Sequence, residues 1–182
     1  SCLVGSEMCI RDRLKRIRKD LNFKLIRGNV DTRIRKLKNG EYDAIILAKA
    51  GLSSLNLDNE ITQEFSNNEL IPSAGQGTIA VQCRKDDTDI IELLNKINHE
   101  KTSMCVKAER EVLKVLDGDC ETAVGATSKI VDDKIHLSGE LFSIDGSRRY
   151  FYETSKNLSD FYMAGEEVGK KLKEESQGNY KK

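Results

Sequence analysis

A thiol stands in the loop sequence Asp-Gly-Asp-Cys-Glu-Thr, where Cys120 could hold a chemical group covalently. Asp117, Asp119 and Glu121 surround it with negative charge. Negative charge disfavours the thiolate, whereas reactive cysteines usually lie in electropositive surroundings. The residues themselves therefore leave two interpretations open, a covalent attachment point and an ordinary loop cysteine.

Arg27 and Arg33 enclose the segment Arg-Gly-Asn-Val-Asp-Thr-Arg, between an expected strand and an expected helix. The carboxyl end of such a strand is where α/β sheets bind ligands. A cation in the first turn of a helix opposes the helix dipole by about 0.3–1 kcal/mol unless an anion offsets it. Guanidinium groups bind carboxylates bidentately, and N–H groups at the helix start add to the attraction. The segment is thus a candidate carboxylate site; the alternative is that Arg33 pairs with a nearby acid or faces water.

A glycine-containing loop, Ser-Ala-Gly-Gln-Gly at 73–77, follows the only proline of the chain. Walker and dinucleotide fingerprints need a glycine-rich turn that opens directly into a helix, and a strand is expected here instead. The pattern favours a tight turn between domains over a phosphate-binding loop.

The charge balance argues against several classes of partner. Lys and Arg together number 30, as do Asp and Glu, so the net charge is +0, although basic residues gather between 11 and 38. We therefore expect neither nucleic acid nor an anionic membrane as partner. No apolar run approaches the roughly 20 residues that span a bilayer.

Cysteine usage indicates a reducing, cytoplasmic setting. The five cysteines are Cys2, Cys9, Cys83, Cys105 and Cys120. They show no paired or metal-ligand spacing, and His99 and His136 are expected to be structural, so no metal site is predicted.

The first half of the chain has an α/β pattern. Residues 1–13 lack a clean period and are predicted to be an artefactual or non-native leader, the alternative being an irregular native terminus. A strand at 23–26, a helix that begins at Asn29 or Asp31 and stops at Gly40, and a buried strand at 42–48 then form a βαβ unit.

The second half has an α+β pattern. The expected elements are a strand at 78–83, helices at 88–98 and 103–116, strands at 123–131, 134–144 and 148–154, and a helix at 158–175. Gly118 is expected to stop a helix, and Asp145-Gly146 to form a hairpin turn. This predicts a small C-terminal α+β domain with a three-stranded antiparallel sheet covered by helices.

Four ordered motifs together resemble the porphobilinogen deaminase (hydroxymethylbilane synthase) family from about Leu14 onward. They are Arg27–Arg33, Gly40–Ala48 with Ala50-Gly-Leu, Pro72–Gly77 and Asp117–Cys120. The resemblance implies a transferase of tetrapyrrole (porphyrin and haem) biosynthesis. Such an enzyme deaminates and polymerises four molecules of porphobilinogen, its small-molecule substrate, into hydroxymethylbilane.

The resemblance also implies the site residues. Cys120 matches the cysteine that holds a dipyrromethane cofactor covalently, through a thioether. Arg27 and Arg33 match arginines that bind the carboxylates of cofactor and substrate. Gln76 and Gly77 match substrate-binding positions near the active-site cleft. The full-length enzyme is implied to be a monomer.

The same resemblance implies that the chain is an incomplete three-domain protein. A periplasmic-binding-protein-like α/β lobe, domain 2, takes 14–71; the connection and the C-terminal part of domain 1 take 72–98; domain 3 takes 99–182. The catalytic aspartate would belong to a segment that precedes these residues, so the resemblance implies no catalytic residue here and no turnover by this chain. The alternative function is a small-anion-binding α/β module without catalysis.

Departures from the family pattern concern the N-terminus and the apolar residues of domain 1. A Ser-Ser-x-Arg-Arg segment is expected near 3–9, where Leu-Val-Gly-Ser-Glu-Met-Cys stands, and a basic residue is expected at Ser54. Arg11 and Arg13 are not taken as replacements. An uncovered apolar face is expected in the 78–98 segment, formed by Ile79, Val81, Ile90, Ile91 and Leu94.

Overall fold

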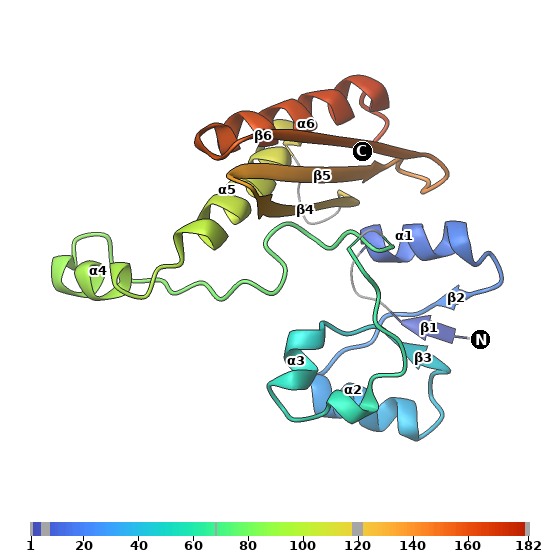
Figure 1. The fold of residues 1–182 in the computed structure, drawn as a ribbon. Coiled ribbons are helices and arrows are strands. Elements are labelled where there is room, and N and C mark those ends of the chain that lie inside the picture. Colours follow the sequence, from blue (N-terminus) through green and yellow to red (C-terminus); the bar gives the residue numbers. More distant parts are fainter. Residues whose placement is uncertain (1, 5–7, 68, 118–121, 181–182) are drawn as a thin grey trace.

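The computed structural model describes residues 2–4, 8–67, 69–117 and 122–180. In these residues the chain forms two three-stranded sheets, one parallel near the N-terminus and one antiparallel near the C-terminus. An extended segment and helix α4 (Thr88–Asn95) project away from both sheets (Figure 1). The expected mixed α/β character is confirmed.

The N-terminal sheet has the order β2-β1-β3. Its strands are β1 (Cys2–Val4), β2 (Asn22–Phe23) and β3 (Ala44–Ile45), with helix α1 (Met8–Ile17) between β1 and β2. The expected strands at 23–26 and 42–48 are therefore much shorter than predicted, and they do not pair with each other. Both instead pair in parallel with the three-residue β1, and the ladder extends no further than β1 offers partners.

Helix α2 (Val30–Lys38) confirms the predicted helix and both of its ends. The side chain of Asn29 caps the helix by accepting a hydrogen bond from the Thr32 N–H at 3.0 Å. Ile34 is buried, and Gly40 follows the helix with a φ of 76°. Helix α3 (Lys49–Ser53) and the 3₁₀ turn η1 (Asp58–Glu60) complete this part.

The predicted strand at 78–83 is wrong. This segment is extended but unpaired, with Ile79 92% and Val81 61% exposed. A strand needs a neighbour for its backbone N–H and C=O groups, and no described segment is hydrogen-bonded alongside it. Ile90 is also exposed, whereas Ile91 and Leu94 are half-buried.

The C-terminal domain confirms the predicted sheet of three antiparallel strands packed against helices. The elements are α5 (Glu100–Leu116), β4 (Val124–Val131), β5 (Lys134–Phe142), β6 (Arg149–Asn157), η2 (Leu158–Asp160) and α6 (Phe161–Ser176). Asp132 and Asp133 join β4 to β5 with φ of 49° and 54°, as a two-residue hairpin requires. Helix α5 ends at Leu116 and is followed by its C-cap Asp117, with a φ of 56°; Gly118, the predicted helix stop, lies outside the described residues.

One face of this sheet and the two long helices enclose the core (Figure 1). The buried members are Ala108, Val112, Leu116, Val124, Ala126, Ile135, Leu137, Leu141, Ala164, Val168, Leu172 and Tyr180. Because α5 is held on this core, the C-terminal end of the helix at Leu116 is fixed within the domain.

Candidate functional site

The candidate carboxylate site lies where the chain enters α2. Arg33 Nε donates to the Gly28 carbonyl at 2.8 Å, and Lys36 Nζ donates to the Arg27 carbonyl at 3.3 Å. Gly28 has a φ of 122°, and a Cβ there would lie 2.8 Å from the Thr32 Cγ2 atom. Within the described part of the chain, neither Arg27 nor Arg33 forms an ion pair with a carboxylate. Both guanidinium groups thus keep hydrogen-bond donors for an external anion.

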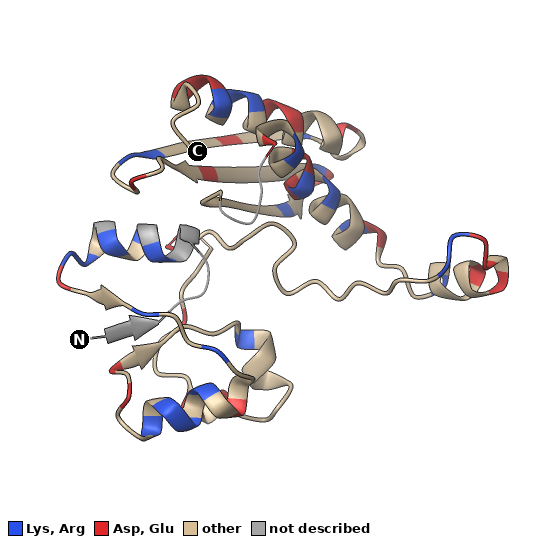
Figure 2. Cartoon of the chain, turned by 180° about the vertical axis from the view of Figure 1, so that it is seen from behind, with Lys and Arg blue, Asp and Glu red and all other residues tan. Residues whose placement is uncertain are grey.

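Positive charge gathers around this site. Figure 2 shows Lys and Arg positions along α1 and α2, on either side of the N-terminal sheet. Arg27 is exposed and Arg33 half-buried. A local excess of basic residues attracts anions, although the whole chain is neutral.

The glycine-containing loop is a tight turn, as the sequence indicates. The Gln76 N–H donates to the Ser73 carbonyl at 3.0 Å, and the Thr78 N–H donates to the Gly75 carbonyl at 3.1 Å. Gly75 and Gly77 have φ of 75° and 79°, which other residues rarely adopt. Gln76 and Gly77 are both exposed at this turn.

A buried carboxylate holds the turn in place. Glu109 Oε2 accepts a hydrogen bond from the Gly75 N–H at 2.8 Å. Its Oε1 accepts from both the N–H and the hydroxyl of Ser128, each at 2.8 Å. Burial raises the pKa of Glu109, and these hydrogen bonds to Gly75 and Ser128 work against the rise. The charge is therefore removed from water but surrounded by donors.

Sequence reasoning missed Glu109, although the pattern held a signal. The residue lies on the apolar stripe of α5, one position after Ala108 and three before Val112. Only 8% of Glu109 is exposed. An acid on a buried stripe needs partners, which could have marked it as a polar contact to another element.

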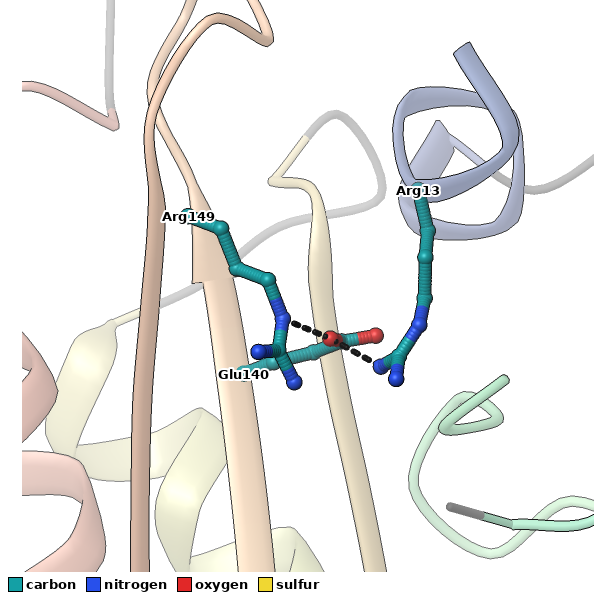
Figure 3. Close-up of polar contacts among 3 residues, drawn as sticks. All are labelled: Arg13, Glu140 and Arg149. Atoms are coloured by element: carbon teal, nitrogen blue, oxygen red, sulfur yellow. Dashed lines mark hydrogen bonds and ion pairs between the residues drawn. The ribbon is translucent and has the colours of Figure 1, made fainter. Parts of the chain in front are cut away.

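Glu140 is a second buried carboxylate that the sequence did not reveal. It lies on β5, on the face opposite Ile135 and Leu137, and is 0% exposed. Arg149 Nε pairs with its Oε2 at 2.8 Å, and Arg13 of α1 pairs with the same oxygen (Figure 3). Its Oε1 has no hydrogen-bond partner within the described residues. Alternation along the strand predicts that Glu140 faces solvent. Helix α1 packs over this face of the sheet, and Glu140 is buried instead.

The predicted site residues fall into separate groups. Arg27 lies in the loop before α2 and Arg33 on α2, whereas Gln76 and Gly77 belong to a turn bound by α5 and β4. No hydrogen bond or ion pair connects the two groups in the part of the chain that the structure describes. Cys120 lies outside the described residues.

Two general features complete the description. Across 2–4, 8–67, 69–117 and 122–180, no cluster of three or more His, Cys, Asp or Glu side chains is arranged to hold a metal ion. In the same ranges, no helix combines the length and apolar character needed to cross a membrane.

Two family profiles match the chain in order. Residues 4–92 match "Porphobilinogen deaminase, dipyromethane cofactor binding domain", and residues 103–177 match "Porphobilinogen deaminase, C-terminal domain". The first range contains Arg27, Arg33 and the turn that carries Gln76. Cys120 falls in the second range, so the profile whose description mentions the cofactor does not include the cysteine predicted to hold it.

The predicted leader overlaps the first match. The match begins at residue 4, and the structure places β1 and α1 partly within residues 1–13. The expected Ser-Ser-x-Arg-Arg pattern is absent from these residues. That residues 1–13 are non-native stays a prediction, which the genomic sequence upstream of Leu14 would test.

Several curated proteins resemble most of the chain. The porphobilinogen deaminase of Clostridium acetobutylicum is 40% identical over 162 residues, which is 89% of this chain and 55% of that protein. That of Staphylococcus carnosus is 39% identical over 158 residues (86% and 51%), and that of Bacillus pumilus 44% over 147 residues (79% and 47%). The chain thus spans about half the length of the curated relatives it matches. With two profiles in order and relatives of about 40% identity, the chain belongs to the porphobilinogen deaminase family.

Proposed function

We propose that the chain is part of a hydroxymethylbilane synthase, the transferase that deaminates and joins four porphobilinogen molecules into hydroxymethylbilane. The observation that carries the proposal is the ordered match of both family profiles, one of them described as a cofactor-binding domain. We further propose that the whole enzyme is a cytoplasmic monomer and that its lobe at 14–71 resembles periplasmic binding proteins.

The proposed cofactor is dipyrromethane, attached covalently to Cys120. A dipyrromethane carries acetate and propionate groups, and the donor set fits such a group: Arg27 and Arg33 are cations without carboxylate partners among the described residues. When bound, the cofactor supplies the primer to which new pyrrole rings are added. The cysteine then acts as a tether and need not be a recycling nucleophile.

The chain's own residues have binding roles in this proposal. Arg27 and Arg33 hold carboxylates of the cofactor and the growing chain by charge-assisted hydrogen bonds. Gln76 offers a side-chain amide from the exposed turn, and Gly77 lets the backbone approach the substrate closely. By itself the chain does not turn over porphobilinogen, since the acid/base carboxylate of the family resemblance is not among its residues.

Intact-mass analysis tests the attachment. The chain is expressed together with a complete deaminase that supplies the cofactor, then purified and weighed as wild type, Cys120→Ser and Cys105→Ser. We expect a dipyrromethane adduct on the wild type and on Cys105→Ser, and none on Cys120→Ser. A wild type that stays unmodified beside a loaded complete enzyme, or an adduct that persists in Cys120→Ser, would overturn the assignment.

The anion-binding alternative predicts a different result. A module without catalysis binds dicarboxylates through Arg27 and Arg33 and carries no adduct.

Hydroxymethylbilane formation by the purified 182-residue chain would contradict the proposed lack of turnover.

A further inference from the structure

We infer that Glu109 is a positioning residue that holds the turn carrying Gln76 and Gly77 on the C-terminal domain. The turn therefore moves together with that domain. The inference deepens the proposed function and rests on it for the role of the turn. The contacts that carry it are independent of any ligand.

The carboxylate of Glu109 joins three elements. It belongs to α5, and it accepts the Gly75 N–H of the turn and both donors of Ser128 on β4, all at 2.8 Å. Gly75 approaches the same helix, since a Cβ there would lie 3.6 Å from the Val106 Cγ1 atom. A charged acceptor buried among three donors holds its partners more strongly than a neutral one.

Backbone contacts dock the residues before the turn on the same strand. The Ala126 N–H donates to the Pro72 carbonyl at 3.0 Å. Gly125 permits this approach, because a Cβ there would lie 2.9 Å from the Ile71 carbonyl oxygen. Ile71 is only 3% exposed. The chain from Ile71 to Gly75 therefore lies against β4 and α5.

The docking ends immediately after the turn. Ile79 is 92% and Val81 61% exposed, and neither belongs to a helix or strand. The boundary between the C-terminal domain and the extended segment thus falls after Gly77. The family resemblance instead assigns residues 72–98 to the first domain.

This boundary has a consequence for the site. Helix α5 carries Glu109 and ends at Leu116, about 10 Å further along the helix axis. The turn with Gln76 is therefore connected to this helix through Glu109. Arg27 lies in the loop between β2 and α2 instead, so a movement between the two parts changes the distance from Gln76 to Arg27.

Residual dipolar couplings of the wild-type chain test this directly. In an aligned sample, the N–H couplings of Gly75, Gln76 and Gly77 are compared with alignment tensors fitted separately to the C-terminal domain and to the N-terminal part. We expect the three couplings to fit the tensor of α5, α6 and the antiparallel sheet. Couplings that fit only the N-terminal tensor, or that average close to zero, would overturn the inference.

Amide exchange then tests the role of the carboxylate. Glu109→Gln leaves one acceptor oxygen and introduces a donor, so the Gly75 and Ser128 amides cannot both keep their bonds. We expect at least one of them to exchange about ten-fold faster or more, with Leu137 in the core unchanged. The matched control is Glu166→Gln on α6, an exposed acid paired with Lys170. Unchanged exchange of both amides in Glu109→Gln would show that the carboxylate does not hold the turn.

Neither measurement needs cofactor or substrate. The absence of an adduct on Cys120 would therefore refute the proposed attachment without bearing on the docking of the turn. Conversely, motion of Gly75 independent of the C-terminal domain would refute the inference without bearing on the adduct experiment.

Discussion

Replacing Gly165 with alanine tests the helix packing on which the C-terminal domain depends. Gly165 lies where α6 crosses α5, and a Cβ there would lie 2.3 Å from the Ala108 carbonyl oxygen and 2.7 Å from the Glu111 Cβ. Real Cβ atoms essentially never come within 3.0 Å of another heavy atom. Because the Ala108 oxygen belongs to a helix backbone, it cannot rotate away, and α6 must move outward.

The expected loss follows from two opposing effects. Inserting a methyl group into a packed interface costs about 1–3 kcal/mol. Removing a glycine from a helix interior returns about 0.5–1 kcal/mol. The steric cost exceeds the conformational gain because the clashing atom, the Ala108 oxygen, belongs to the main chain. We therefore expect Gly165→Ala to lower the free energy of unfolding by about 1–2 kcal/mol.

Urea unfolding followed by tyrosine emission measures this loss. The chain has no tryptophan, and four of its five tyrosines lie in the C-terminal domain, so the signal reports mainly that domain. We expect a lower urea midpoint with an unchanged slope. The control is Lys170→Ala on the exposed face of the same helix, whose surface ion pair with Glu166 should contribute little to stability. A Gly165→Ala variant as stable as the wild type would refute the reasoning.

Three further predictions concern charged residues. Arg27→Ala should weaken binding of a carboxylate-bearing dipyrromethane about ten-fold or more in calorimetry, whereas Arg35→Ala on exposed α2 should not; equal losses would contradict a specific site. Arg149→Met should lower the urea midpoint because Glu140 stays buried with one fewer partner, whereas Arg148→Met at an exposed position should not; equal midpoints for the two variants would count against this. Since burial raises the pKa of Glu109 above its ordinary value of 4.5, the folded chain binds a proton more readily than the unfolded chain. The unfolding free energy of the wild type should therefore rise relative to Glu109→Gln as pH falls from neutral, with the gain complete below 4.5; parallel profiles would exclude it.

Local signals predicted much of the fold correctly. The cap at Asn29 and the glycine at Gly40 bound α2 as expected, because capping depends on a few neighbouring residues. Period-two alternation and turn residues predicted the antiparallel sheet and the turn at Asp145-Gly146, where Gly146 has a φ of 70°, for the same reason. These elements obtain their partners from chain segments a few residues away.

Predictions that needed a distant partner were less successful. The alternation at 78–83 is that of a strand, yet the segment is unpaired because none of the described residues supplies a neighbouring strand. The strands expected at 23–26 and 42–48 were shortened for a related reason: their partner is the short β1 rather than each other. Periodicity reports which side chains share a face, and it carries no information about what the backbone pairs with.

The sequence by itself determined the family, through the order and spacing of four motifs. It also identified Arg27, Arg33 and Cys120 as candidate site residues. Only the tertiary structure decided that Glu109 and Glu140 are buried, and that the turn carrying Gln76 docks on the C-terminal domain. The physical reason is that the burial of a charge depends on which other element covers it. A strand or helix period marks a face, but the partner that removes this face from water comes from a distant part of the chain.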